Sequence, residues 1–362
     1  MQTLPVSSSI PLPGDADGTA GWDAINQALS GLYGSQAARH YGTASSWTLG
    51  GEDPLDGISV YWAALPRPHW HYVSYGLSEL YGKDSDDAAL SGFGFELTFR
   101  LAAMEGEDAA SAPPVWPMNL MQNLARYVFG SGNAFQAGHS LNANGPISLA
   151  RPTCLRHVVF MPDPQLEPRD TPNGHLQFLQ VVGVADEEAD AMLRWSPDAV
   201  MHVLQPRMPL WITDLGRASL LDDPELAARV HAGSMAEGSS TGAVYVTTLD
   251  WSGRDGQTVE LVMGATEAGN LATLLPLRLP FGRTLELVSS ERTWTFEAGS
   301  EDNAILGPQH ARFTLSPARV ATLQAGGRDI ATLHHVLADA GLVVKLPPMD
   351  PVSSSARPLR MA

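Results

Sequence analysis

Alternating hydrophobic positions predict β-strands through the first half of the chain. In residues 93–101 every second residue is Phe or Leu, while Glu96, Thr98 and Arg100 lie among the intervening positions. Such alternation is typical of a half-buried strand that turns its polar face outward. Similar extended runs are predicted at residues 58–62, 69–75, 157–161 and 175–184.

Helical spacing predicts two helices in the same region. Trp22, Ile25, Leu29 and Leu32 recur on one helical face, and Gly34 offers a left-handed stop. A second amphipathic helix is expected at residues 117–129. Two further helix starts are predicted where a capping residue precedes proline, at Ser196-Pro197 and Asp223-Pro224.

A glycine-rich stretch divides the chain. Residues 232–242 read Ala-Gly-Ser-Met-Ala-Glu-Gly-Ser-Ser-Thr-Gly, a composition typical of a linker. We therefore expect a domain at 18–232, a linker at 233–242 and a domain at 243–348, with flexible ends at 1–17 and 349–362. The second domain is expected to hold strands at 244–249, 259–263, 285–288, 294–296 and 342–346, and helices from Ser316 and around 330–340.

Composition narrows the functional classes. The 362 residues carry a formal net charge of −17 and contain no basic run, so we expect no nucleic-acid partner. An acidic surface favours basic partners, but an acidic surface that only keeps the protein in solution is the simpler interpretation. No stretch is apolar enough to span a membrane, and the single cysteine, Cys154, excludes an intramolecular disulfide. We expect a cytoplasmic protein and read Cys154 as a buried structural residue.

Few residues suggest catalysis. The chain lacks HExxH, GxGxxG and phosphate-loop motifs. His69 and His71 lie two apart on a predicted strand, so they would share one face and could bind a metal with Glu79 or Asp84. A metal-assisted hydrolase is therefore an alternative hypothesis, whereas two histidines inside a purely structural strand are the simpler interpretation. We expect no cofactor.

Three long segments resemble the N-terminal domain of the Suppressor of fused family. Residues 50–56 read Gly-Gly-Glu-Asp-Pro-Leu-Asp, residues 69–81 read His-Trp-His-Tyr-Val-Ser-Tyr-Gly-Leu-Ser-Glu-Leu-Tyr, and residues 91–100 read Ser-Gly-Phe-Gly-Phe-Glu-Leu-Thr-Phe-Arg. Shorter matches follow in order at 112–114, 116–117, 124–129, 178–184 and 211–214. The resemblance is strong over about residues 20–230 and weak beyond them.

The resemblance implies an α+β protein of two α/β-type domains, with mixed or antiparallel sheets flanked by helices. It also implies a non-catalytic module that sequesters a partner protein by holding an extended segment between the domains, through β-augmentation. In bacteria such a protein is expected to give immunity against a toxin, and the partner would then be a toxin segment. Regulation of a Hedgehog-type transcription factor is the other role that the family suggests. We expect a monomer.

The resemblance also assigns binding positions. Gly138 matches the glycine that follows two aromatic cleft residues, and His139 stands where the family has an aspartate that contacts the peptide. This exchange removes the acidic contact of the animal relatives. The partner-binding residues implied are Tyr127, Phe135, His139, Val244, Tyr245, Thr247 and Leu277.

Overall fold

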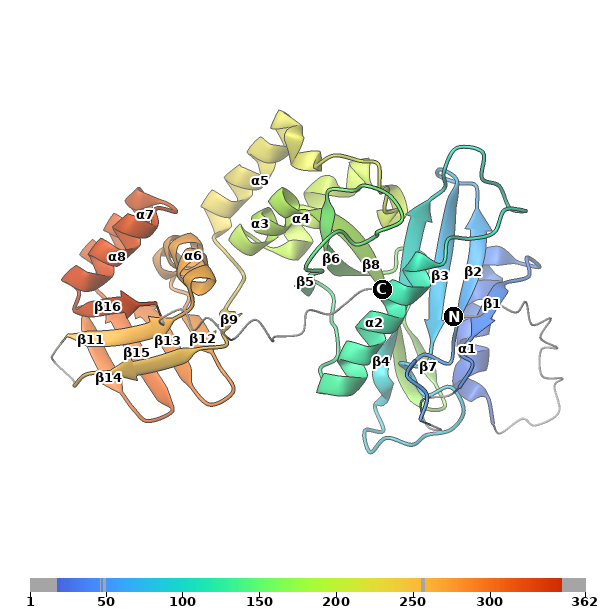
Figure 1. Ribbon diagram of the computed structural model, residues 1–362, viewed down its shortest axis with the longest axis horizontal. Helices are drawn as coiled ribbons and strands as arrows, with labels where there is room; N and C mark the ends of the chain where they lie inside the picture. The colour runs from blue at the N-terminus through green and yellow to red at the C-terminus, as the bar shows by residue number, and fades with distance from the viewer. Residues whose placement is uncertain (1–17, 46, 48–49, 255–257, 347–362) are drawn as a thin grey trace.

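The computed structural model describes residues 18–45, 47, 50–254 and 258–346. Two domains follow one another along the chain and lie side by side in Figure 1, the first coloured blue to yellow and the second orange to red. The flexible ends predicted at 1–17 and 349–362 lie outside the described residues. Within the described residues, no helix is long and apolar enough to cross a membrane.

The N-terminal domain is built on a mixed eight-stranded sheet. Six strands run in the order β1-β2-β3-β4-β8-β6, β5 forms the edge beyond β6, and β7 pairs with β8. Among the described strands of this sheet, only β4 and β8 are parallel neighbours. The strands are β1 (Arg39–Gly42), β2 (Gly57–Ala63), β3 (His69–Tyr75), β4 (Leu90–Ala102), β5 (Ser140–Asn142), β6 (Leu155–Pro162), β7 (Arg169–Thr171) and β8 (Gly174–Ala185).

Five helices accompany this sheet, and the predicted capping residues begin two of them. The side chain of Ser196 accepts a hydrogen bond from the amide of Ala199, and that of Asp223 accepts one from Glu225. Gly132 ends the second helix in a left-handed conformation. The helices are α1 (Ala20–Tyr33), α2 (Trp116–Ser131), α3 (Asp186–Arg194), α4 (Pro197–Leu204) and α5 (Pro224–Glu237), with 3₁₀ turns η2 (Gln205–Arg207), η3 (Pro209–Trp211) and η4 (Leu220–Asp222).

Strand β4 is buried on both faces, so the prediction of an exposed polar face was wrong. Glu96, Thr98 and Arg100 are each 0% exposed. Their burial is possible because each has partners: Ser78 donates its amide and hydroxyl to Glu96, and Thr98 and Arg100 bind Asp163. The alternation of apolar and polar residues in β4 therefore corresponds to two buried faces, one packed against apolar groups and one bonded to polar groups.

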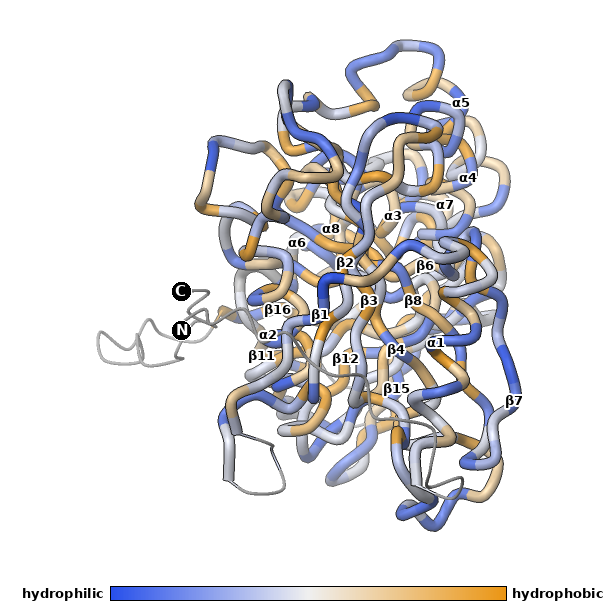
Figure 2. The backbone as a smooth tube through the Cα atoms, turned by 90° about the vertical axis from the view of Figure 1, so that its right-hand side faces the viewer, coloured by the Kyte–Doolittle hydropathy of each residue, from blue (hydrophilic) through white to orange (hydrophobic). Residues whose placement is uncertain are grey.

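Apolar residues concentrate along the central strands. In Figure 2 the hydrophobic colour runs mainly through the interior, and many of the projecting loops are hydrophilic. One core fills the space between the sheet and α2, and two others lie under α1 and under α3–α5. Cys154, expected in such a core, is instead exposed, and its thiol donates to the carbonyl oxygen of Arg217.

The C-terminal domain contains two smaller sheets. One has the order β14-β15-β13-β12-β9 and the other β10-β11-β16. The elements are β9 (Ala243–Tyr245), β10 (Leu249–Ser252), β11 (Val259–Met263), α6 (Ala265–Leu274), η5 (Leu275–Leu277), η6 (Leu279–Phe281), β12 (Leu285–Val288), β13 (Thr293–Ala298), β14 (Asn303–Leu306), β15 (His310–Leu315), α7 (Pro317–Gly326), α8 (Ile330–Asp339) and β16 (Leu342–Lys345).

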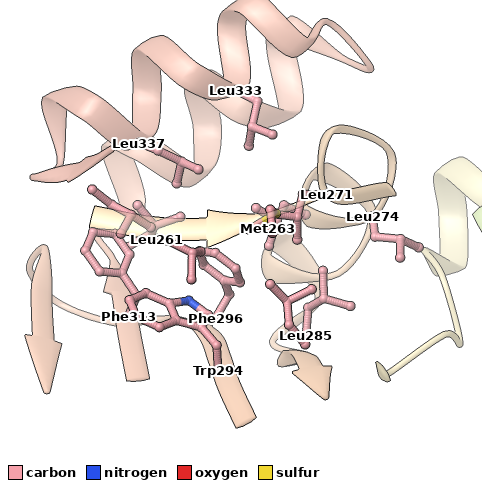
Figure 3. Packing of buried hydrophobic residues seen from close by; sticks show 14 of the residues in the cluster. Leu261, Met263, Leu271, Leu274, Leu285, Trp294, Phe296, Phe313, Leu333 and Leu337 are labelled. Atoms are coloured by element: carbon pink, nitrogen blue, oxygen red, sulfur yellow. The ribbon is translucent and has the colours of Figure 1, made fainter. Parts of the chain in front are cut away.

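A single core joins these layers. Figure 3 shows Leu333 and Leu337 of α8 on one side of β11, and Trp294, Phe296 and Phe313 of the larger sheet on the other. All five side chains are at most 1% exposed. The expected α+β class, with mixed sheets flanked by helices, is confirmed.

Helix α5 occupies the first half of the segment predicted as a linker, residues 233–242. Helix α5 continues to Glu237, and Gly238 ends it with a positive φ of 69°. A Cβ atom on Gly238 would lie 2.4 Å from the carbonyl oxygen of Leu277, so only glycine fits without strain. The chain therefore passes between the domains in close contact with both.

Candidate partner-binding site

A stack of three aromatic rings ends at the surface of the N-terminal domain. Tyr127 of α2 stacks on Phe135, with ring centroids 5.5 Å apart and planes 13° apart, and Phe135 stacks on Phe160 of β6 at 4.1 Å and 16°. Tyr127 is 37% exposed and Phe135 only 4%. Tyr127 therefore presents an aromatic face that Phe135 holds in place from below.

The turn after this stack leads into β5. The amide of Gly138 donates to the carbonyl of Phe160 at 2.8 Å, and the amide of Phe160 donates to the carbonyl of His139 at 2.9 Å. Gly138 has a φ of 83°, which glycine adopts readily. The exposed ring of His139 accepts a hydrogen bond from the amide of Gln136 at 3.3 Å. His139 thus lies beside the start of β5 with one ring nitrogen directed at its own turn.

Strand β5 ends the eight-stranded sheet and pairs only with β6 among the described strands. The amide of Ala143 and the carbonyl of His139 bond to β6. Because antiparallel pairing alternates, Leu141 also turns its main-chain groups toward β6, and Ser140 and Asn142 turn theirs outward. Two residues of β5 therefore offer main-chain donors and acceptors to a further strand.

Strand β9 is the matching edge of the C-terminal domain. It pairs in parallel with β12. The carbonyl of Gly242 accepts a hydrogen bond from the amide of Glu286, and the amide of Val246 donates one to the carbonyl of Val288. The alternation turns the main-chain groups of Ala243 and Tyr245 away from β12. The β5 and β9 labels stand on the sides that the two domains turn toward each other in Figure 1.

The side chains of β9 divide between core and surface. Val244 is 8% exposed and belongs to the domain core, whereas Tyr245 is 81% exposed. Thr247 follows the strand and is also exposed. Among these three predicted binding residues, Tyr245 and Thr247 have accessible side chains, and Val244 anchors the strand.

Leu277, the remaining predicted residue, lies at the junction between the domains. Its carbonyl accepts a hydrogen bond from the amide of Ser239 at 2.8 Å, and its side chain is half-buried. Ser239 also donates its hydroxyl to the carbonyl of Leu193 in α3, while its own carbonyl accepts from Arg278 and Arg283. One serine therefore ties the N-terminal domain to η5 and its surroundings.

An ion pair forms a second contact between the domains. Arg328, which precedes α8, directs both guanidinium nitrogens at the carboxylate of Asp190 in α3, at 2.9 and 2.7 Å. Bidentate pairing of this kind restricts orientation as well as distance. Together with the Ser239 contacts, it links the two domains that carry the β5 and β9 edges.

The histidine pair considered for metal binding is buried instead. His69 and His71 are 0% exposed on β3. Nδ1 of His71 lies 2.7 Å from the hydroxyl of Tyr33, and its Nε2 lies 3.3 Å from a carboxylate oxygen of Asp163. Nδ1 of His69 donates to the carbonyl of Arg67 at 2.7 Å. Burial, aided by the charge of nearby Arg100, lowers the pKa of His71 to about 4.

The carboxylate of Glu79, one of the two residues considered as a third ligand, is also occupied. Glu79 accepts hydrogen bonds from Lys83 and from the amides of Asp84, Ser85 and Gly92, and although partial burial opposes ionisation, these bonds lower its pKa to about 2. Within the part of the chain that the structure describes, no group of three His, Cys, Asp or Glu side chains could hold a metal ion. The alternative metal site considered for this spacing therefore finds no supporting group among these residues.

Comparisons with known proteins agree with this architecture. Residues 51–218 match the family Suppressor of fused protein (SUFU). The Suppressor of fused homologs of Homo sapiens and Mus musculus are each 41% identical over 213 residues, which cover 54% of this chain and 43% of theirs. The chain therefore aligns with less than half the length of these relatives.

Two solved structures extend the comparison. The crystal structure of Drosophila Suppressor of Fused matches with a TM-score of 0.74 at 24% identity, covering 92% of this chain and 93% of that one. A chain of the Sufu-Fu complex crystal structure matches with a TM-score of 0.55 at 33% identity, covering 59% and 98%. Through the domain at residues 51–218, this chain belongs to the Suppressor of fused family.

Proposed function

We propose that this protein is a non-catalytic binding module that holds an extended segment of a partner protein between β5 and β9. The observation that supports the proposal is the pair of free sheet edges on the facing sides of the domains. Each edge offers outward main-chain groups from two residues, Ser140 and Asn142 on β5 and Ala243 and Tyr245 on β9. A short extended segment could bond to both edges at once.

Side chains would add selectivity to this main-chain recognition. Tyr127 and Tyr245 expose aromatic surface near the two edges, and aromatic anchors contribute much of the affinity in protein interfaces. Phe135 supports Tyr127 rather than contacting the partner directly. Leu277 and Thr247 complete the set that we propose for the C-terminal side.

The comparisons favour protein binding over catalysis. A chain of a two-protein complex, Sufu-Fu, resembles this chain at 33% identity. The hydrolase alternative loses its support because His69 and His71 are buried and bonded to protein groups. We therefore assign no catalytic residue.

Sequestration is the action that we propose, because a segment held on both sides cannot reach another partner. In a bacterial cell the role would be immunity against a toxin, with the protein acting as a cytoplasmic monomer. Control of a Hedgehog-type transcription factor is less favoured, since His139 replaces the acidic residue that the family resemblance assigns to peptide contact.

Affinity capture from native lysate by the immobilised full chain tests the proposal. The binding variant is Tyr127→Ala/Tyr245→Ala, and the control is Leu65→Ala, which removes a side chain of equal exposure, 80% against 81% for Tyr245, from the β2–β3 turn. A third variant, Ala243→Pro, removes an outward main-chain donor from β9, keeps the Tyr245 side chain and leaves the ladder to β12 intact.

The proposal predicts one partner that the wild type and Leu65→Ala retain and that both Tyr127→Ala/Tyr245→Ala and Ala243→Pro lose. Circular dichroism would establish that all variants are folded. Equal capture by every variant would place binding elsewhere on the molecule. Retention by Ala243→Pro together with loss by Tyr127→Ala/Tyr245→Ala would argue for side-chain docking without an added strand.

A further inference from the structure

A cavity lies next to the start of β5, on the side of the sheet that carries α4. It has a volume of about 430 Å³. Its walls come from the end of β6, the loop at residues 162–168, part of β8, the outer face of α4 and the 3₁₀ turns that follow α4. None of the positions assigned from the sequence lines it.

Buried polar groups shape the loop wall of this cavity. Asp163 accepts hydrogen bonds from the amides of Gln165 and Leu166, which close the loop into a tight turn. The same carboxylate binds the guanidinium of Arg100 through both nitrogens, at 2.6 and 3.1 Å. The loop is thereby attached to the centre of the sheet.

The opposite wall is held just as firmly. Leu210 and Trp211 both have a φ of 53°, a left-handed conformation that is uncommon outside glycine. The side-chain amide of Gln180 donates to both of their carbonyls at 2.9 Å, and Gln180 in turn accepts from Arg100. Arg100 therefore connects both walls, and the cavity is preformed.

The mouth of the cavity is acidic. Its lining contains the carboxylates of Asp163, Glu167 and Asp198, and no Lys or Arg occurs among the described lining residues. Arg100 compensates the charge of Asp163. Glu167 and Asp198 are exposed, and neither side chain has a hydrogen bond or ion pair in the described structure. Two carboxylates thus remain available to a cation.

Apolar groups complete the lining. Pro162, Leu166 and Trp211 contribute to the walls between the carboxylates. A long side chain with an apolar stem and a charged end matches this combination, because the stem packs on the walls while the end meets the carboxylates. Among protein side chains, arginine and lysine have this form.

The cavity adjoins the edge on which we propose that a partner strand lies. A Cβ atom on Gly138 would lie 3.7 Å from both carboxylate oxygens of Asp198. Gly138 is two residues before Ser140, the first residue of β5. A segment that pairs with β5 and continues past Ser140 would therefore bring its next side chain to the cavity.

We propose that this cavity is a subsite for an arginine side chain of the bound segment. Asp198 and Glu167 would receive the guanidinium group, whose planar donors suit carboxylates better than the ammonium of lysine. The assignment of the subsite to a bound segment rests on the proposed function. The preference of the cavity itself for a guanidinium group is a property of the free protein and can be tested without a partner.

The test titrates the full chain with N-acetyl-arginine amide and follows the backbone amide NMR signals of the non-proline residues in 163–168, which are Asp163, Gln165, Leu166 and Glu167. N-acetyl-citrulline amide, similar in shape but uncharged, is the matched probe. We expect saturable shifts with the arginine derivative and at least fivefold weaker binding of the citrulline derivative. Asp198→Asn/Glu167→Gln should weaken arginine binding at least fivefold.

The control variant Asp86→Asn/Glu291→Gln removes two exposed carboxylates elsewhere, and it should bind the arginine derivative like the wild type. Equal binding of both probes, shifts absent from residues 163–168, or equal weakening in the control variant would overturn the subsite. Loss of the proposed function would appear separately, as partner capture that does not depend on Tyr127 and Tyr245.

Discussion

The ion pair between Arg100 and Asp163 offers the sharpest prediction about stability. Both side chains are 0% exposed, and the carboxylate of Asp163 accepts five hydrogen bonds, from Thr98, twice from Arg100, and from the amides of Gln165 and Leu166. Although burial opposes ionisation, His71 and Arg100 hold the pKa of Asp163 far below its usual range. The pair is therefore charged in the folded protein.

Removing one partner leaves the other charge buried and uncompensated. Such losses cost about 3–5 kcal/mol in free energy of unfolding. We expect Asp163→Asn and Arg100→Met each to fall in this range, because every replacement leaves a polar group without its partner. The double variant should lose less than the sum of the two, since it removes both charges and leaves neither unpaired.

Urea unfolding at pH 7, followed by far-ultraviolet circular dichroism and tryptophan fluorescence, measures these free energies. Circular dichroism reports both domains, whereas seven of the nine tryptophans lie in the N-terminal domain, so different midpoints from the two probes would reveal independent unfolding of the second domain. Costs below about 1 kcal/mol for both single variants, or a double variant equal to their sum, would refute the view that the pair is a coupled buried unit.

Three other predictions follow from single features. Reversing one charge of the interdomain pair, in Asp190→Arg or Arg328→Asp, should increase the radius of gyration in small-angle scattering, and the double reversal should restore it. Burial lowers the pKa values of His69 and His71 from 6.5 to about 4, so each histidine binds a proton between pH 7 and pH 5 in the unfolded chain but not in the folded protein. Each should therefore lower the free energy of unfolding by about 2 kcal/mol as the pH falls from 7 to 5. Urea midpoints across this range, compared with those of His71→Gln, measure the loss. Gly238→Ala should lower stability by about 1–3 kcal/mol in urea unfolding, since its φ of 69° and its contact with Leu277 exclude a side chain.

Most long elements were predictable because their own residues determine them. Strand β3 was predicted at residues 69–75 and is found at His69–Tyr75, and β11 and β12 also have the predicted bounds. In each case hydrophobic residues dominate a run of ordinary strand length between polar or glycine-containing segments. The capping signals at Ser196 and Asp223 act through contacts a few residues away, so the sequence contains them directly.

The candidate site was much less predictable because its parts are short and depend on distant neighbours. Strand β5 has three residues and no hydrophobic alternation of its own, and it is a strand because β6 pairs with it. The burial of Arg100 depends on Asp163 and Gln180, which lie 63 and 80 positions away. The residues next to Arg100 in the sequence do not indicate which distant side chains will bind it.

The position of the domain junction illustrates the same limit. Small residues near Gly238 indicated a linker, but α5 extends through Glu237, and the Ser239 hydrogen bonds occupy the junction itself. Glycine-rich composition there reflects close packing rather than freedom of movement. Only the three-dimensional arrangement distinguishes these two uses of glycine.

Hydrogen–deuterium exchange on the complex with the captured partner tests whether one segment contacts both sheet edges. We expect partner binding to slow exchange at residues 140–142 of β5 and 243–245 of β9 together, because the outward amides of both edges gain hydrogen bonds. Slowing at one edge alone would reduce the site to a single domain. Unchanged exchange at both edges, in a complex that remains intact, would contradict the claim that a partner segment is held between them.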